Sequence, residues 1–156
     1  MKLYVNIDGG SRGNPGPSVA AMVISGPDGQ VLLTKSKYLG PAMTNNYAEW
    51  SALEGAVKAV LRLTGQYGPL EAEIHCDSEL VVRQFNRAYK IRHPDLINIA
   101  GQIWNNLEKN PTLKIKVVHV PREENKLADA AVNQELDKQK KKTSVESGVN
   151  PETYFF

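Results

Sequence analysis

The alternation of polar and apolar residues near the N-terminus constrains the fold more than any other feature of this sequence. Residues 3–8 alternate apolar and polar side chains, which predicts a β-strand with one buried face. Residues 18–26 and 30–39 flank the turn sequence Pro27-Asp28-Gly29. This arrangement predicts an antiparallel hairpin. The chain therefore begins with three strands, two of them joined by a tight turn.

The apolar period becomes helical at Thr44, and helices and strands then alternate. A helix is predicted from Thr44 to Leu63, with Gly65 as its stop. Three strands followed by alternating helices and strands predict an α/β fold in which helices cover a mixed sheet. The later elements are predicted as a strand over 70–76, a helix over 78–86, a helix from Pro94 to about residue 110, a strand over 113–120 and a last helix after Pro121.

The length and composition of the chain exclude several classes of protein. A chain of 156 residues can bury the core of one domain, and no apolar run approaches the ~20 residues of a membrane span. The N-terminus lacks a signal-peptide pattern. The single cysteine, Cys76, rules out an internal disulfide and fits a reducing compartment, so we expect a cytoplasmic protein. One cysteine and three histidines also supply too few ligands for a structural zinc site.

The net charge of +2 does not by itself indicate a nucleic-acid partner, but the basic residues gather in two places. One cluster lies between Arg83 and His93, and the other contains the four lysines between Lys138 and Lys142. Each cluster is compatible with a solvated surface as well as with a phosphate-binding one.

Four acidic residues occupy unusual positions in the predicted elements. Glu49 shares a helix face with apolar residues at i+4, i+7 and i+11, and Asp129 shares one with apolar residues at i+3 and i+7. Asp8 is predicted to end the first strand, and Asp77 follows the strand over 70–76. Each has an ordinary interpretation, as a turn residue, a helix cap or an acidic group that interacts favourably with the positive end of the helix dipole.

Taken together, the four acids favour a second interpretation. Carboxylates that lie close together repel and take up protons unless a cation neutralises them. Hard oxygen ligands suit Mg²⁺ or Mn²⁺, and two such ions about 4 Å apart can activate a water in phosphodiester cleavage. The pattern thus leads to a hypothesis of metal-dependent phosphoryl transfer, provided that the four acids meet in the fold.

Four stretches of the sequence resemble ribonuclease H of type 1, in that family's order and spacing. They are IDGGSRGNPGP with Asp8, TNNYAEWSALEGA with Glu49, IHCDSELVVRQFN with Asp77, and HVPREENKLADAAVN with Asp129. The resemblance covers roughly residues 2–137. It implies the α/β ribonuclease H-like fold, a five-stranded mixed sheet with three antiparallel strands followed by two parallel ones, whose acids converge at one end.

The resemblance also implies a reaction, the endonucleolytic hydrolysis of the RNA strand of an RNA–DNA hybrid, which leaves 5′-phosphate and 3′-hydroxyl ends. It implies two Mg²⁺ ions, with Mn²⁺ as a substitute. Asp8 would bridge both ions, Glu49 and Asp77 would hold one with the RNA phosphate, and Asp129 would hold the ion beside the attacking water. His119 matches a histidine that assists proton transfer or product release; its alternative is an ordinary strand-end residue.

Substrate contacts are implied by the same match. RNA differs from DNA by its 2′-hydroxyl, which such a site has to recognise. Thr44 falls where the family binds a phosphate of the DNA strand, and it also reads as a helix N-cap. The residues that match the 2′-hydroxyl contacts are Gly10, Ser11, Gly13, Asn14, Asn45 and Asn46.

The sequence departs from many bacterial relatives after the second helix. A long basic protrusion is replaced by RAYKIRHPDL, in which Arg87, Lys90 and Arg92 are expected to contact the DNA strand, and His93 stands where a phosphate-contacting asparagine is expected. We therefore expect a single-domain member that lacks the protrusion and lacks a preceding hybrid-binding domain.

The catalytic domain is predicted over residues 1–137, and residues 138–156 are predicted to be a lysine-rich, flexible tail. Its lysines would replace part of the missing protrusion. Its last three residues, 154–156, could dock on the protein's own body or on a replication partner, or be inert. The family further implies a monomer without a membrane partner that removes RNA primers and R-loops.

Two other functions remain open at this point. A nuclease of broader preference would also cut double-stranded RNA. A binding module with the same fold would lack catalysis, although all four acids are present. A nucleotide-binding protein is less favoured, because GGSRGNPG has neither the P-loop lysine nor the dinucleotide fingerprint.

Overall fold

The first strand lies at the centre of the sheet. In the computed structural model, which describes residues 1–148 and the side chains of residues 1–142, β1 (Lys2–Ser11) buries Leu3, Val5 and Ile7 on one face. The residues between them are partly exposed on the other face. The predicted alternation is therefore confirmed, although β1 continues for three residues beyond Asp8. The prediction that Asp8 ends the strand is wrong.

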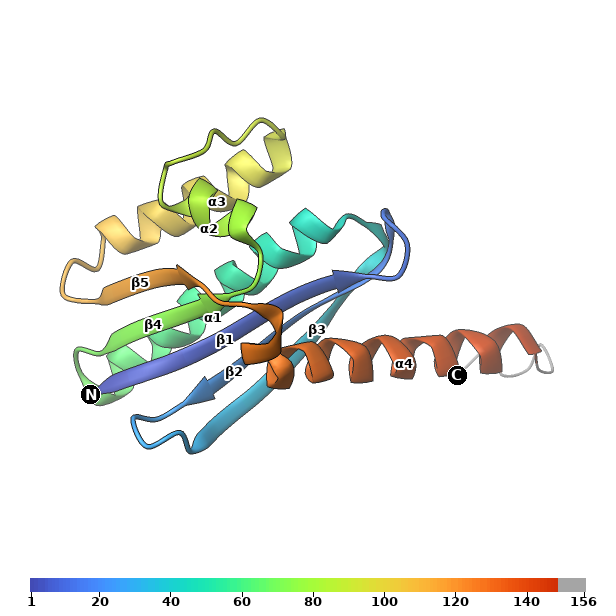
Figure 1. The fold of residues 1–156 in the computed structure, drawn as a ribbon, viewed down its shortest axis with the longest axis horizontal. Helices are drawn as coiled ribbons and strands as arrows, with labels where there is room; N and C mark the ends of the chain where they lie inside the picture. The colour runs from blue at the N-terminus through green and yellow to red at the C-terminus, as the bar shows by residue number, and fades with distance from the viewer. Residues whose placement is uncertain (149–156) are drawn as a thin grey trace.

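Five strands form one mixed sheet in the order β3-β2-β1-β4-β5. β2 (Gly16–Ser25) and β3 (Val31–Met43) are antiparallel to their neighbours, whereas β4 (Glu71–Cys76) and β5 (Lys114–His119) are parallel to β1. The hairpin between β2 and β3 turns at Gly29, whose φ is 81°. The predicted fold, three antiparallel strands followed by two parallel ones, is confirmed (Figure 1).

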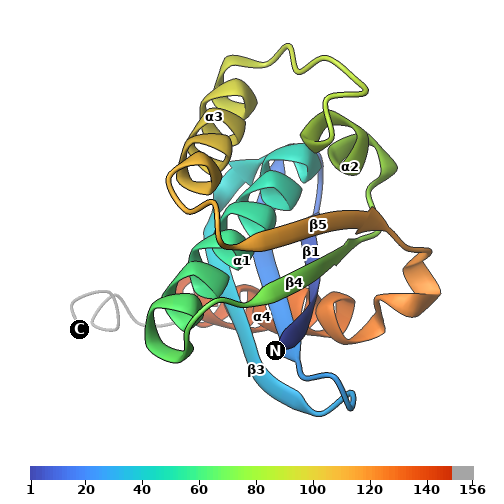
Figure 2. The same ribbon diagram turned by 90° about the vertical axis from the view of Figure 1, so that its left-hand side faces the viewer.

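Helices cover both faces of the sheet. α1 (Asn45–Tyr67), α2 (Glu79–Phe85) and α3 (Pro94–Glu108) lie over one face, and α4 (Lys126–Gly148) crosses the other (Figures 1 and 2). A short 3₁₀ helix, η1 (Arg122–Glu124), connects β5 to α4. Because the two parallel strands need crossover connections, α1 and the α2–α3 pair lie on the same side.

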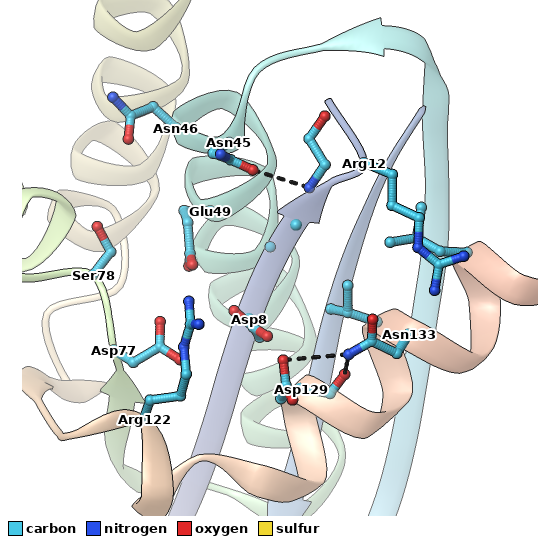
Figure 3. A pocket seen from close by; sticks show the side chains of 15 residues that line it. Asp8, Arg12, Asn45, Asn46, Glu49, Asp77, Ser78, Arg122, Asp129 and Asn133 are labelled. Carbon is cyan, nitrogen blue, oxygen red and sulfur yellow. Dashed lines mark hydrogen bonds between the residues drawn. The ribbon is translucent and has the colours of Figure 1, made fainter. Parts of the chain in front are cut away.

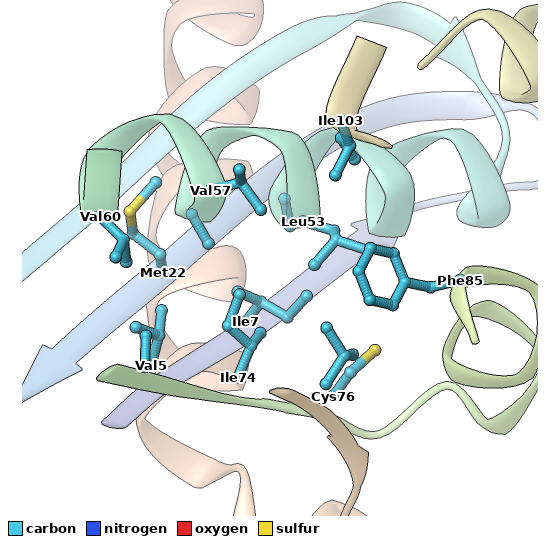
Figure 4. Close-up of a cluster of buried hydrophobic side chains, with 14 of the residues drawn as sticks. Val5, Ile7, Met22, Leu53, Val57, Val60, Ile74, Cys76, Phe85 and Ile103 are labelled. Carbon is cyan, nitrogen blue, oxygen red and sulfur yellow. The ribbon is translucent and has the colours of Figure 1, made fainter. Parts of the chain in front are cut away.

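The larger core lies between α1 and the sheet. Leu53, Val57 and Val60 of α1 are at most 1% exposed and belong to one cluster with the apolar faces of β1, β2 and β4 (Figure 4). A smaller cluster on the other face joins Val132 and Leu136 of α4 to β2. β2 is thus buried on both faces, and α1 is fixed more extensively than α4.

Two element boundaries differ from the prediction. α1 continues through Gly65 and ends at Tyr67, because Gly68 has the left-handed φ of 88° and donates its N–H to the Thr64 carbonyl. Gly65 faces open space and is tolerated inside the helix. β3 runs four residues past the predicted end at residue 39, up to Met43.

The last helix is longer than the sequence pattern indicated. α4 passes residue 137 without a break and ends at Gly148, so residues 138–148 of the predicted tail are helical. Apolar periodicity fades there because the helix extends beyond the sheet that its first half covers (Figure 1). The predicted docking residues 154–156 lie outside the described residues. Within residues 1–148, no helix has the length and apolar content needed to cross a bilayer.

Candidate active site

Three carboxylates meet where the pairing of β1 with β4 ends. The last paired residues are Ile7 and Cys76, so Asp8 and Asp77 come next on neighbouring strands. Glu49 reaches the same point from the first turns of α1. One carboxylate oxygen from each of the three residues lies within 4.8 Å of the others. Asp129 of α4 lines the same cleft, whose volume is about 470 Å³, but does not belong to this close group (Figure 3).

Gly9 allows α1 to lie close against β1. A Cβ atom at Gly9 would lie 2.2 Å from the Ala48 carbonyl carbon and 2.3 Å from the Glu49 nitrogen, both of which are backbone atoms. Only a residue without a side chain therefore lets α1 come close enough to bring Glu49 beside Asp8. The sequence analysis did not select Gly9, although the Gly-Gly pair after Asp8 was a usable signal.

The acids divide by burial. Asp8 and Glu49 are each 6% exposed, whereas Asp77 and Asp129 are half-buried. Burial, reinforced by the Asp77 charge, raises the pKa of Asp8 to about 7. Burial and then the Asp8 charge raise the pKa of Glu49 well above its ordinary value. Asp129 shares a helix face with the buried residues Val132 and Leu136 but is itself less buried than Asp8.

Asn125 connects the two sides of the cleft. It is completely buried, and its Nδ2 donates to the Ile7 carbonyl at 2.7 Å and to Asp77 Oδ2 at 3.2 Å. Its Oδ1 accepts from Asn6 Nδ2 at 2.9 Å, and its carbonyl accepts from the Asp129 N–H at 3.1 Å. One side chain thus orients Asp77 and anchors the start of α4, from which Asp129 projects.

The glycine-rich segment is tied to the start of α1. Asn45 Oδ1 accepts from the Ser11 N–H at 3.0 Å, and Asn14 Oδ1 accepts from the Asn45 N–H at 3.1 Å. The Asn45 oxygen is therefore engaged within the protein, and Asn45 also lines the acidic cleft. Four of the residues predicted to contact substrate line the acidic cleft, namely Gly10, Ser11, Asn45 and Asn46.

A second cavity of about 820 Å³ adjoins the first, between the starts of α1 and α3. It is lined by Asn14, Thr44 and His93, together with Asn45 and Asn46 from the boundary between the cavities. Thr44 caps α1 by accepting from the Tyr47 N–H at 3.2 Å, as its ordinary interpretation predicts. Among the predicted contacts, Gly13 lines neither cavity.

The basic connection lies away from the acids. Arg87, Lys90 and Arg92 are exposed, and none of them lines the acidic cleft. Arg87 has the unusual φ of 63°, and its guanidinium lies 4.0 Å from the centre of the Trp104 ring. This cation–π contact holds the short connection against α3.

His119 is the last residue of β5 and is paired in register with Cys76. It is exposed and does not line the acidic cleft. Its position at the carboxyl end of a strand places it at the same edge of the sheet as Asp8 and Asp77. The role predicted for His119 stays a prediction.

Several residues of the cleft were missed by the sequence analysis. Arg12 lines it and ion-pairs with Asp137 of α4 at 2.6 Å. Asn133 donates to the Asp129 carbonyl at 3.1 Å, one turn away on α4. Ser78, next to Asp77, was missed as well. Arg122 of η1 also lines the cleft, and it lies inside the motif HVPREENKLADAAVN on which the resemblance rests. The i+4 spacing of Asn133 after Asp129 was a signal, whereas the position of Arg12 depends on the path of the loop.

The donor set fits a divalent cation. All the converging groups are carboxylate oxygens, the ligands that Mg²⁺ and Mn²⁺ prefer. Among residues 1–142, no lysine, arginine or histidine forms an ion pair with any of the four acids. Their charge is therefore left to protons, as the raised pKa values of Asp8 and Glu49 indicate, or to a bound metal ion.

Comparison with known proteins agrees with this geometry. The family described as reverse transcriptase-like matches residues 6–135. The chain is 35% identical over 137 residues to a Mycobacterium tuberculosis protein described as bifunctional, covering 88% of this chain and 36% of the relative. It is 35% identical over 136 residues to Ribonuclease HI of Halobacterium salinarum, covering 87% of this chain and 65% of the relative.

The fold agrees equally well with a solved structure. The crystal structure of an RNase H1 named LC11, in complex with an RNA/DNA hybrid, superposes with a TM-score of 0.81 and 36% identity, over 88% of this chain and 98% of that one. The chain spans only about a third of the mycobacterial relative's length. Because the family match covers residues 6–135, the chain belongs to the reverse transcriptase-like family. The superposition shows that it has the fold of the RNase H1 structures.

Proposed function

We propose that this chain is an endoribonuclease that hydrolyses the RNA strand of RNA–DNA hybrids with two divalent metal ions. The observation that carries the proposal is the group of three carboxylates, with oxygens within 4.8 Å, none of which is ion-paired to a lysine, arginine or histidine among residues 1–142. The similar RNase H1 solved with an RNA/DNA hybrid supports the choice of substrate.

The residues divide the work according to their positions. Asp8, in the middle of the group, would bind both ions, Glu49 and Asp77 would bind one of them, and Asp129 would bind the other from the α4 side. When bound, Mg²⁺ ions supply a water of lowered pKa and stabilise the charge on the leaving oxygen. Asn125 would keep Asp77 and α4 in register, so that the ligands stay at fixed positions.

The reaction is a balanced hydrolysis. The oxygen of a water forms a bond to the phosphorus of an RNA phosphodiester, and the bond between that phosphorus and the 3′ oxygen breaks. The water gives up a proton and the 3′ oxygen takes one, which leaves a 5′-phosphate and a 3′-hydroxyl. His119 would accept the proton or assist product release from the edge of the site.

Recognition of RNA would depend on the glycine-rich segment and the start of α1. Gly10, Ser11, Asn45 and Asn46 line the cleft beside the acids, and the Asn45 Nδ2 would donate to a 2′-hydroxyl. Asn14 and Thr44 line the adjacent cavity, where Asn14 would contact a 2′-hydroxyl and Thr44 a phosphate of the DNA strand. Gly13 is proposed as a further 2′-hydroxyl contact, and Arg87, Lys90 and Arg92 would contact the DNA strand further along the duplex.

The proposal extends to cellular context. Removal of RNA primers and clearance of R-loops are the processes that such an activity would serve. A cytoplasmic location fits the free thiol of the buried Cys76, and the monomer is proposed from the resemblance to the family. The domain boundary at residue 137 is part of the proposal too, although α4 crosses it.

The decisive experiment is cleavage of labelled duplexes analysed on gels. RNA–DNA with either strand labelled, RNA–RNA and DNA–DNA would each be incubated with Mg²⁺, Mn²⁺ or EDTA. We expect cleavage of the hybrid's RNA strand alone, abolished by EDTA and by Asp8→Asn. Asp28→Asn is the matched control, because Asp28 lies in the β2–β3 turn and its Oδ1 accepts only a local hydrogen bond.

The other outcomes separate the competing functions. Cleavage of RNA–RNA as well would favour the broader nuclease. Hybrid binding without cleavage under either metal would leave the binding module and refute the enzyme. Product ends are read by ligation and by phosphatase sensitivity, and a 3′-phosphate would contradict the proposed hydrolysis.

A further inference from the structure

The side of α4 that lines the acidic cleft continues beyond the sheet. Asp129, Asn133 and Leu136 all line the cleft, and their spacing of i, i+4 and i+7 places them on one helix face. The next position on that face, i+11, is Lys140, which is exposed. Figure 1 shows α4 running on past the sheet in this region. A lysine therefore follows Asp129 on the same face of α4.

The other lysines of the cluster do not share this face. Lys138 and Lys141 line a separate cavity between α4 and β3, opposite Thr34 and Ser36. Since each helical residue turns the chain by about 100°, Lys138 lies about 160° around the axis from Lys140. The lysines between Lys138 and Lys142 look equivalent in the sequence, but the helix places Lys140 on the cleft side and Lys138 on the opposite side.

Arg12 adds a second cation on the cleft side. Its guanidinium lines the cleft and pairs with Asp137 of α4 at 2.6 Å, with 39% of its side chain exposed. Asp137 neutralises part of that charge and holds the loop against α4. Among residues 1–142, Lys140 takes part in no ion pair, so its charge is available to a ligand.

We propose that Lys140, together with Arg12, binds phosphates of the hybrid where the duplex leaves the acidic cleft along α4. The inference rests on the proposed function and adds a nucleic-acid contact on α4, beyond the acidic cleft. Eleven residues of helix separate Lys140 from Asp129 by about 16 Å, which corresponds to roughly five nucleotides of a strand. The ligand is the polyanionic backbone, so the contact is independent of sequence.

The test compares two single-charge changes. Lys140→Gln and Lys138→Gln would each be made in the full chain carrying Asp8→Asn, and binding of a 20-base-pair hybrid would be followed by fluorescence anisotropy between 50 and 200 mM salt. We expect Lys140→Gln to weaken binding about fivefold at 150 mM salt and to lower the slope of log K against log salt by about 0.9. We expect Lys138→Gln to change neither quantity.

A second arm locates the contact. Hybrids lengthened by six base pairs on one side or the other of a fixed cleavage site would be used with the otherwise wild-type enzyme. We expect Lys140→Gln to raise KM on only one of the two extended hybrids. Equal effects of Lys138→Gln and Lys140→Gln, or no effect of either, would overturn the inference.

The two proposals fail in different ways. An enzyme that cuts the hybrid but is insensitive to Lys140→Gln loses only the contact along α4. A chain that binds hybrid with the expected loss in Lys140→Gln but never cuts it retains the contact and loses the proposed activity.

Discussion

The two halves of the acidic site differ in how they are held. Asp8 and Glu49 are each 6% exposed and come from β1 and α1, the two elements that the larger core fixes. Asp77 and Asp129 are half-buried and depend on Asn125 and the start of α4. The buried pair stores unfavourable charge that a cation would relieve, whereas the half-exposed pair is screened by water. Metal affinity and folding stability are therefore coupled through the buried half.

Asp8→Asn should have the largest effect on activity, because it changes a carboxylate of the buried pair. Hydrolysis of the hybrid should fall by at least about a thousandfold, because the proposed central metal ligand loses its charge. In EDTA at pH 8, however, the variant should melt higher than wild type by about 3–8 °C, since it removes a repelled carboxylate worth about 1–2 kcal/mol. Gel assays and thermal unfolding measure the two effects.

Asp129→Asn sharpens the contrast with Asp8→Asn. It should also lose most of its activity, but its melting temperature in EDTA should stay within about 1 °C of wild type, because half-buried charge changes contribute little. A gain in melting temperature equal to that of Asp8→Asn would show that burial does not distinguish the two halves.

Gly9→Ala tests the approach of α1 to β1. The added methyl would overlap backbone atoms of Ala48 and Glu49, so α1 has to move. We expect a loss of about 1–3 kcal/mol in the free energy of unfolding and about a hundredfold in kcat. Gly65→Ala is the control, since a Cβ there meets nothing within 4 Å. It should be neutral or stabilising, and an equal loss in both variants would contradict the explanation.

Asn125→Ala tests the connection to the half-exposed acids. It leaves the buried Ile7 carbonyl without its donor, which should lower the free energy of unfolding by about 1–3 kcal/mol. Activity should fall by about 10–100-fold as Asp77 loses its orientation. Urea unfolding and steady-state kinetics measure these effects. An unchanged kcat would exclude a positioning role.

The pH dependence of stability tests the raised pKa of Asp8 directly. The pKa of Asp8 is about 3.8 in the unfolded chain and about 7 in the fold, so between these values the native state binds more protons. Without metal, stability should therefore fall as the pH rises from 5 to 8. Melting curves in EDTA would show this fall, which should be smaller in Asp8→Asn. Saturating Mg²⁺ should reverse it, because a bound cation favours the charged form. A wild-type slope equal to that of Asp8→Asn would contradict the pKa assignment.

Most of the fold was predictable because its signals are local. The alternation in β1, the Pro27-Asp28-Gly29 turn and the period of α1 each arise from a few consecutive residues, and the five-stranded sheet followed once the family resemblance was recognised. The errors in the predicted fold lie at the ends of helices and strands, where competing sequence signals stand close together. Gly65 looked like a helix stop, but Gly68 is the residue with positive φ.

By itself, the sequence determined the four acids, the strands and helices that carry them and the motifs that indicate hybrid hydrolysis. Only the tertiary structure decided which acids are buried, because burial depends on how β1, β4 and α1 pack together rather than on any residue's neighbours in the chain. The same holds for Gly9, whose value lies in a contact with α1, and for Asn125, which bridges residues 118 and 48 positions away. It holds as well for Lys140, which only the continued helix α4 places in line with Asp129.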